Sequence, residues 1–232
     1  MRLTNKILLI ALVLLLISFT AFRIMFNNRV ELVPNPYKKG FTDSTFTLGK
    51  ISAFEIKGNY YVRFIKSEYD SIKIKGADNL AERYTKIERT GDILSIKALT
   101  DLSHYPGMIE LTIYAKNIES ISASHGSMVT LEKFYDNDFN VTAEDSAIVN
   151  ASECSFVNLI VSTKDKSVVS IENTVNATVN IHNTSSVFLT VESGEINGSI
   201  DENAELILWG DIKNNLAIKK GKEIVKGEAR HE

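Results

Sequence analysis

The chain has 232 residues, of which 44% are hydrophobic and 24% are charged, and its net charge at pH 7 is −3. This size and composition fit one globular domain with appendages, and the small negative charge argues against a nucleic-acid-binding protein. The single cysteine, Cys154, excludes an internal disulfide, and we interpret it as a small buried hydrophobic residue rather than a reactive thiol.

The chain opens with an apolar run over residues 7–22, broken only by Ser18 and Thr20. Extended to residue 26, the run is long enough to span about 30 Å of hydrocarbon if Arg23 reaches the interface. A cleaved signal peptide begins in the same way, but no clean site of small residues follows. We therefore predict that residues 1–28 form an uncleaved transmembrane helix, with a signal peptide as the alternative.

The orientation of this helix is ambiguous in the sequence. More basic residues follow the apolar run than precede it, which by the positive-inside rule favours a cytoplasmic C-terminal part. The very short N-terminal tail favours the opposite orientation. We predict an inner-membrane anchor with the domain exported to the periplasm or cell surface. Residues 29–47 follow as an extended tether, because Pro34 and Pro36 favour extended backbone.

Short alternating segments come next. Residues 51–58, 61–66, 71–76 and 87–97 predict about four short strands with glycine at the turns, and residues 109–114 predict a further strand. Together they predict a leading sheet of short strands before the next part of the chain.

From residue 117 to about residue 209, one apolar–polar unit recurs roughly every 20 residues. Ile121, Val141 and Val161 begin three aligned copies, and Val179 and Ile196 begin two more. One unit cannot bury its apolar face alone, but stacked units share a core. We predict an all-β fold: a parallel β-helix or β-solenoid of about five coils. A β-sandwich built from hairpins is the alternative.

Several of these residues carry a family resemblance. The relevant positions are Phe54, Ile56 and Gly58, then Ile72, Ile74, Gly76, Asp78, Asn79 and Leu80, then Gly91, Leu94 and Ile96, and finally Trp209 and Gly210. Over residues 48–225 the chain resembles the putative auto-transporter adhesin head GIN domain family of bacterial surface proteins, abundant in Bacteroidetes. The resemblance implies an exported, membrane-associated β-helical domain without an established activity.

The chain departs from the family pattern at its turns. The family repeats Ser-Gly-Ser-Gly turns, whereas only Gly126 and Gly194 occupy such sites here. Turns that need a positive φ must therefore use Asn, Asp or Ser at some cost. Residues 217–225 are expected to add a last strand that caps the stack, and residues 226–232 are expected to be a disordered tail.

The sequence indicates no catalytic, cofactor-binding or metal-binding residue. His104, His125, His182 and His231 are too scattered for a metal motif. Stacking would bring Asp145 over Asp165, a pair suited to a cation or to acid–base chemistry. We interpret the pair instead as a solvated turn face whose repulsion Lys164 and Lys166 relieve.

Aromatic residues before the repeats suggest a further candidate surface. They are Tyr60, Tyr61, Phe64, Tyr69, Tyr84, Tyr105 and Tyr114. Such residues can stack on sugars, but more often they pack a sheet.

These observations leave three functional hypotheses. The leading one is a non-enzymatic, membrane-anchored, exported adhesin-like protein that needs no cofactor and binds a polysaccharide or an envelope protein. The second is a membrane-tethered scaffold that polymerises end to end, as bactofilin-like proteins do. The third is a polysaccharide-cleaving enzyme that uses Asp145 and Asp165.

Overall fold

The computed structural model describes residues 41–77, 84–99, 109–210, 213–218 and 225–227, and every regular element in these ranges is a β-strand. The predicted anchor over residues 1–28, residues 29–40 of the predicted tether and residues 228–232 of the predicted tail lie outside the described residues. Residues 41–47, predicted as the end of the tether, instead form a strand of the sheet. Within the described ranges, no helix is long and apolar enough to cross a bilayer.

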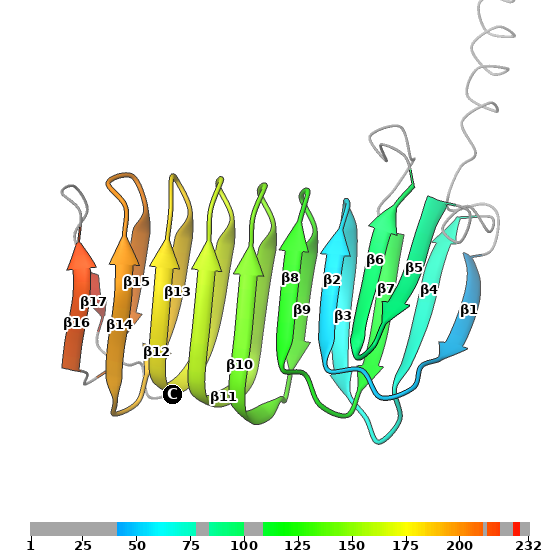
Figure 1. Ribbon diagram of the computed structural model, residues 1–232, viewed down its shortest axis with the longest axis horizontal. Coiled ribbons are helices and arrows are strands. Elements are labelled where there is room, and N and C mark those ends of the chain that lie inside the picture. Colours follow the sequence, from blue (N-terminus) through cyan, green and yellow to red (C-terminus); the bar gives the residue numbers. More distant parts are fainter. Residues whose placement is uncertain (1–40, 78–83, 100–108, 211–212, 219–224, 228–232) are drawn as a thin grey trace, which may run out of the picture. The chain divides into compact units, whose positions relative to one another are not determined.

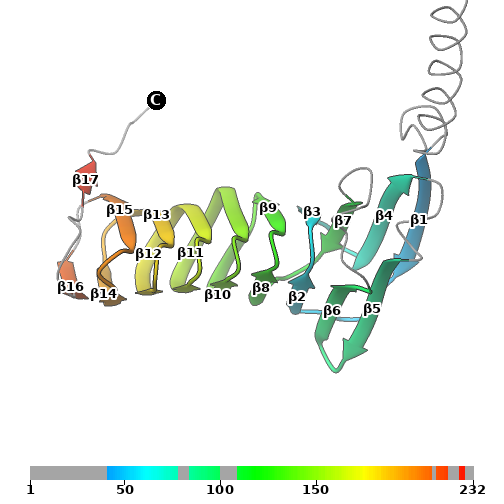
Figure 2. The same cartoon turned by 90° about the horizontal axis from the view of Figure 1, so that it is seen from above.

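The strands form one sheet that curls so that two rows of strands face each other across a buried interior (Figures 1 and 2). The first row contains β6 (Ile93–Ala98), β2 (Ala53–Lys57), β8 (Ser120–Ser124), β10 (Tyr135–Ala143), β11 (Ile148–Thr163), β12 (Val168–Ile181), β14 (Glu195–Ile200) and β16 (Lys213–Ile218). The second row contains β4 (Ser71–Ala77), β7 (Ile109–Ala115), β3 (Tyr60–Lys66), β9 (Met128–Glu132), β13 (Ser186–Val191), β15 (Glu205–Trp209) and β17 (Val225–Gly227). The long strands β11 and β12 belong to both rows, because their first halves pair in the second row and their second halves pair in the first.

Buried residues form in-register columns inside both rows. The first-row column comprises Ile121, Val141, Val161 and Val179, and the second-row column comprises Val129, Val149, Val169, Val187 and Leu206. Val141 and Val161 are parallel partners, as their spacing predicted. Because burying one such side chain stabilises the fold by about 1.5–3 kcal/mol, each strand depends on its neighbours in the stack.

The predicted fold class, a parallel β-helix or β-solenoid, is nevertheless wrong. The sheet is mixed, since β4 pairs antiparallel with both β7 and β1 (Phe41–Thr47), and β5 (Thr85–Thr90) pairs antiparallel with β6. The physical reason is that β4, β5 and β6 lie in segments that reverse direction instead of continuing around the stack. The structure is therefore one curled, mixed sheet, in which parallel pairing holds from β2 and β3 to the C-terminal strands.

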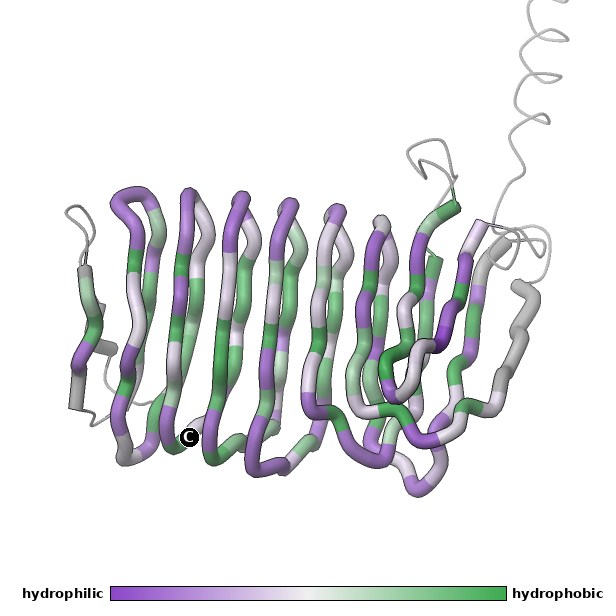
Figure 3. Tube along the Cα trace, in the orientation of Figure 1, coloured by the Kyte–Doolittle hydropathy of each residue, from purple (hydrophilic) through white to green (hydrophobic). Residues whose placement is uncertain are grey.

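Tight turns join the first row to the second, and hydrophilic residues gather at these turns (Figure 3). Several turn residues have the left-handed backbone: His125 (φ 59°), Gly126 (φ 73°), Asp145 (φ 52°), Ser146 (φ 64°), Asp165 (φ 57°), Lys166 (φ 65°) and Asn183 (φ 58°). The expectation that Asn, Asp or Ser would hold these positions is confirmed at Asp145, Ser146, Asp165 and Asn183, whereas His125 and Lys166 depart from it. Each such residue with a Cβ atom costs about 1–2 kcal/mol relative to an unstrained conformation.

Aromatic side chains pack against one another in the interior. The rings of Phe139 and Phe156 stack at 4.4 Å between centroids, and those of Phe54 and Phe64 meet edge to face at 4.8 Å. All four side chains are buried. The interior is therefore close-packed, and groups available for binding lie on the outward faces.

Candidate functional site

The outward face of the first row is mostly polar, with Ile160 as an exposed apolar exception. Its central column comprises Ser122, Thr142, Ser162, Asn180 and Ser199, which are register partners on neighbouring strands. A second column contains an amide ladder, in which Asn158 Nδ2 donates to Asp138 Oδ1 at 2.9 Å and Asn176 Nδ2 donates to Asn158 Oδ1 at 3.3 Å. These side chains satisfy one another along the stack and form a regular hydrophilic surface.

The outward face of the second row carries a line of apolar side chains, interrupted at β13 where Ser186 is the register partner of Val168, and we call this line the apolar band. It comprises Tyr61, Met128, Ile148, Val168, Phe188, Ile207 and Trp209. Tyr61, Met128, Ile148 and Val168 are successive register partners on β3, β9, β11 and β12. The line then moves two residues along the strand to Phe188, whose partner on β15 is Ile207. Ile148 is 38% exposed, and the other members are half-buried.

The band exists because apolar residues occupy both strand faces at these positions. Val129, Val149 and Val169 point inward and are fully buried, so the residue before each of them must point outward. On an outward face a polar residue is the usual choice, and the first row follows that pattern. The apolar band is therefore an exposed feature that packing of the interior does not require.

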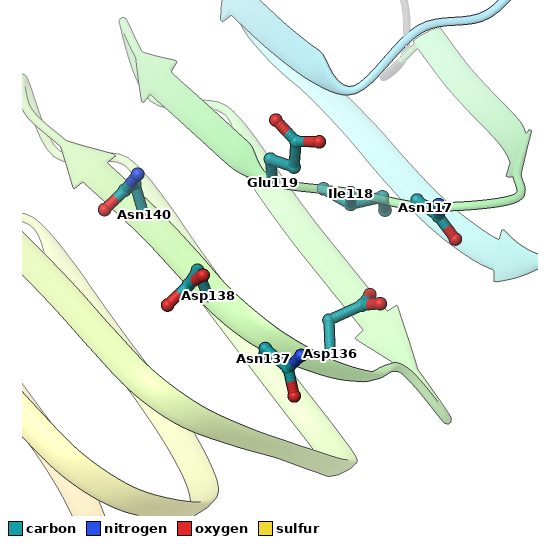
Figure 4. Close-up of a pocket in the computed structure, with 7 residues that line it drawn as sticks. All are labelled: Asn117, Ile118, Glu119, Asp136, Asn137, Asp138 and Asn140. Atoms are coloured by element: carbon teal, nitrogen blue, oxygen red, sulfur yellow. The ribbon is translucent and has the colours of Figure 1, made fainter.

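A polar cavity of about 300 Å³ lies at the start of β8 and β10 (Figure 4). Its lining residues are Asn117, Ile118, Glu119, Asp136, Asn137, Asp138 and Asn140. The cavity forms because β10 pairs with β8 only from Asn140 onward, whereas its earlier residues pair only with β11. Asn140 N donates to Glu119 O at 2.9 Å, so Glu119 stays in contact with β10, whereas Asn117 and Ile118 have no register partner there and a hollow is left between the two segments.

The carboxylates of this cavity differ in their partners. Glu119 Oε2 accepts a hydrogen bond from Ser52 Oγ at 3.2 Å, and Asp138 is held by the amide ladder. Asp136 Oδ2 is buried without a hydrogen-bond partner and lies 3.8 Å from Lys66 Nζ. The cavity thus offers carboxylate and amide groups to hydroxyl-bearing ligands. Among the described residues, no cluster of three His, Cys, Asp or Glu side chains is arranged to hold a metal ion.

The turn carboxylates singled out in the sequence do lie on neighbouring turns, since Ser146 N donates to Asp165 O at 2.9 Å. Each carboxylate has its own partner, however. Asp145 Oδ2 lies 3.6 Å from His125 Nδ1, and Asp165 Oδ1 accepts a hydrogen bond from Asn183. These contacts fit a solvated turn face better than a shared acid–base pair.

Lys164 pairs with a different carboxylate from the two that the sequence predicted it would neutralise. Lys164 Nζ pairs with Glu144 Oε2 at 2.7 Å, and the hydrogen bond and charge of Glu144 raise the pKa of Lys164. The main electrostatic partner of Lys164 is therefore Glu144, and its interactions with Asp145 and Asp165 are weaker.

The histidines within the described ranges occupy separate places. His125 lies beside Ser124 and Asp145, and His182 Nδ1 lies 2.9 Å from Asp201 Oδ2. His104 and His231 lie outside the described residues. The structure therefore does not bring the described histidines together.

The aromatic candidates divide between the interior and the surface. Tyr60 and Phe64 are buried, whereas Tyr61 and Tyr114 are half-buried on outward positions and Tyr69 is 81% exposed. Tyr84 packs against the core, and Tyr105 lies outside the described residues. Only Tyr61 of this set belongs to the apolar band.

Cys154 is buried in the turn region between the two halves of β11, as the sequence predicted. Its Sγ donates to Ser152 O at 3.3 Å and accepts a hydrogen bond from Phe134 N at 3.5 Å. Burial raises the pKa of this thiol, which keeps it protonated and unreactive.

Comparison with known proteins identifies the family. Residues 52–199 match the family described as putative auto-transporter adhesin, head GIN domain. The chain belongs to this family. No curated protein matches the sequence.

Solved structures share the fold of this head GIN domain. A putative adhesin from Bacteroides fragilis matches with a TM-score of 0.67 at 13% identity, covering 83% of this chain and 98% of the other. A putative adhesin from Parabacteroides distasonis matches with a TM-score of 0.54 at 13% identity and the same coverage. At this identity the likeness concerns the fold alone.

The apolar band was not foreseen from the sequence, although a signal was present. The pairs Met128-Val129, Ile148-Val149 and Val168-Val169 place two apolar residues side by side in successive units. In a strand, such a pair must put one apolar residue on each face. The recurrence of these pairs at one position of the unit is the pattern that would have revealed the band.

Proposed function

We propose that this head GIN domain protein is a non-enzymatic, exported adhesin-like protein that binds a partner in the cell envelope or on a surface. The observation that carries the proposal is family membership over residues 52–199. The outward faces of the two rows support it, because in-register columns repeat the same chemical groups over a long surface. Such surfaces suit binding of an extended partner.

The proposal assigns a part to each segment. Residues 1–28 anchor the protein in the inner membrane, and residues 29–40 form the tether. Residues 41–227, from β1 to β17, form the binding domain, and residues 228–232 form the tail. The domain lies in the periplasm or on the cell surface, and its partner is a polysaccharide or an envelope protein. The length and apolar character of residues 7–26 support the anchor.

The scaffold hypothesis has less support. End-to-end polymerisation requires strand edges that accept another copy, and charged edge strands oppose such pairing. β5 pairs with β6 at the start of the first row and carries Lys86, Glu88 and Arg89. The cleaving-enzyme hypothesis also has less support, since Asp145 and Asp165 are engaged by His125 and Asn183.

Topology mapping tests export and anchoring. We expect the full chain with alkaline phosphatase fused after Glu232 to be active and to sediment with membranes. We expect a green fluorescent protein fusion at the same site to be dark if it is exported by the unfolded route. Deletion of residues 1–28 should reverse both results. A bright fluorescent fusion together with an inactive phosphatase fusion would contradict export.

Binding to envelopes tests the adhesin-like role separately. The full chain, purified in detergent and labelled, should sediment with isolated cell envelopes in a saturable manner. Unlabelled protein should compete for the same sites. Linear, non-competed sedimentation would contradict a specific partner.

A further inference from the structure

The apolar band has the dimensions of a linear ligand. It crosses β3, β9, β11, β12, β13 and β15, and neighbouring strands lie about 4.8 Å apart, so the band is about 24 Å long. Its width is one to two residues along each strand, or about 7 Å. The resulting area, on the order of 170 Å², is well below the roughly 800 Å² that each partner buries in a stable protein dimer. A second copy of the chain is therefore a poor match, whereas a single extended chain fits.

A polar column runs beside the band over its central part. Thr130, Asn150 and Ser170 are register partners on β9, β11 and β12, two residues beyond Met128, Ile148 and Val168. On its outward face, each of β9, β11 and β12 thus presents one apolar side chain next to one hydroxyl or amide side chain. A pyranose ring has the same division, with C–H groups on its faces and hydroxyl groups along its edges.

Aromatic side chains lie toward both ends of the band. Tyr61 lies on β3, Phe188 on β13 and Trp209 on β15. Flat aromatic rings supply a large contact area to the C–H face of a sugar at low entropic cost. Aliphatic side chains at the centre and rings toward the ends suit a ligand that extends along the whole band.

The charge of the surface argues for a neutral ligand. Neither the apolar band nor the polar column of Thr130, Asn150 and Ser170 contains an acidic or basic side chain. Arg63 on β3 is the register partner of Thr130 and so extends the polar column, but its Nη2 is paired with Glu132 Oε2 at 3.0 Å. Acidic glycans and anionic lipid headgroups would require a row of unpaired basic groups along the surface, and the band and the column of Thr130, Asn150 and Ser170 supply none.

We propose that the apolar band and the adjoining polar column bind a neutral, linear polysaccharide whose sugars follow the stacking direction of the strands. The C–H faces lie on the apolar band, and the hydroxyl groups meet Thr130, Asn150 and Ser170. This inference rests on the proposed adhesin-like function and names its partner.

Affinity electrophoresis of the full chain in detergent tests the inference. Gels contain one of four neutral glycans (hydroxyethylcellulose, xyloglucan, galactomannan or pullulan) or the acidic glycan polygalacturonate. At least one neutral glycan should retard the protein, and polygalacturonate should not. Oligosaccharides of the active glycan should compete with increasing affinity until their length reaches that of the band, and further extension should add nothing.

Matched variants locate the site. The double substitution Ile148→Ser and Val168→Ser should weaken binding at least about tenfold, because two apolar contacts are lost. Ile160→Ser is the control, since Ile160 is 48% exposed but lies on the outward face of the first row. The control should bind as the unchanged protein does. Both variants should keep the unchanged circular dichroism spectrum, because none of the three side chains is buried.

Four results would overturn the inference: no retardation by any neutral glycan, retardation by polygalacturonate alone, equal loss in the Ile160→Ser control, or a concentration-dependent dimer that Ile148→Ser disperses. Binding to vesicles of neutral phospholipid that the double variant abolishes would assign the band to lipid instead. If envelope binding persists while all four neutral glycans fail, the inference is wrong and the proposed function stands.

Discussion

The backbone of Val179 occupies the space that a side chain at Gly198 would need. The two residues are register partners in β12 and β14, and a Cβ atom added at Gly198 would overlap the Val179 carbonyl oxygen. Gly198 also has a φ of 124°, which L-residues rarely adopt. A glycine at this position therefore lets β14 approach β12 closely and continue the stack.

Gly198→Ala should lower the free energy of unfolding by about 2–4 kcal/mol, because overlap and backbone strain act together. Urea unfolding of the full chain measures this loss. Gly126→Ala is the control, since Gly126 has a φ of 73° but no atom within 4 Å of the added Cβ. The control should lose only about 1 kcal/mol. Equal losses would show that the close approach to Val179 does not matter.

Relief of strain at the turns should stabilise the protein. Ser146→Gly and Lys166→Gly should each raise the free energy of unfolding by about 0.5–1 kcal/mol, because glycine removes the left-handed penalty but adds entropy to the unfolded chain. Thr184→Gly is the control, as Thr184 occupies the matching turn position without a positive φ. The control should be neutral or destabilising. A gain in Thr184→Gly as large as in the other two would argue against the assigned turn geometry.

The aromatic stack in the interior should carry a large share of local stability. Phe156→Ala should cost about 3–5 kcal/mol, because Phe156 is buried against Phe139. Phe188→Ala on the outward face should cost clearly less, since that side chain is only half-buried. Chemical denaturation compares the two variants. A larger loss of unfolding free energy in Phe188→Ala than in Phe156→Ala would contradict the assignment of Phe188 to the outward face of β13.

Stability should fall at alkaline pH partly through Cys154. Burial raises the pKa of its thiol in the folded state above the unfolded value of about 8.5. The folded state therefore holds the proton more tightly, so this contribution is complete below about pH 8.5 and is lost as the pH rises through the folded pKa. The unchanged protein should lose more stability between about pH 8 and pH 10 than Cys154→Ala. Identical pH slopes would contradict a buried thiol.

Sequence periodicity predicted the stacking well but not the direction of every strand. The 20-residue spacing correctly paired Val141 with Val161. Alternation in residues 71–76 predicted a strand, which forms as β4, but a period of two is the same in parallel and antiparallel pairs. The antiparallel pairing of Ile72 with Ile113 depends on contacts distant in the sequence, and it makes the sheet mixed.

The candidate surfaces were harder to predict than the core. Val149 could be assigned to the interior from its alternation, but Ile148 becomes part of a band only when four strands align in register. The polar cavity depends on β10 pairing with β8 only from Asn140 onward, which no local pattern encodes. Binding surfaces on stacked strands thus arise from register, and register is fixed by the whole sheet.

Hydroxyl-radical footprinting of the full chain tests the central claim, that the outward face of the second row carries the binding surface. Oxidation is measured with and without the glycan that retards the protein most. Met128 and Trp209 should be protected, while Tyr69 and Tyr135, which are 81% and 64% exposed, should react as before. Protection of Tyr135 with unchanged oxidation of Met128 would contradict the account.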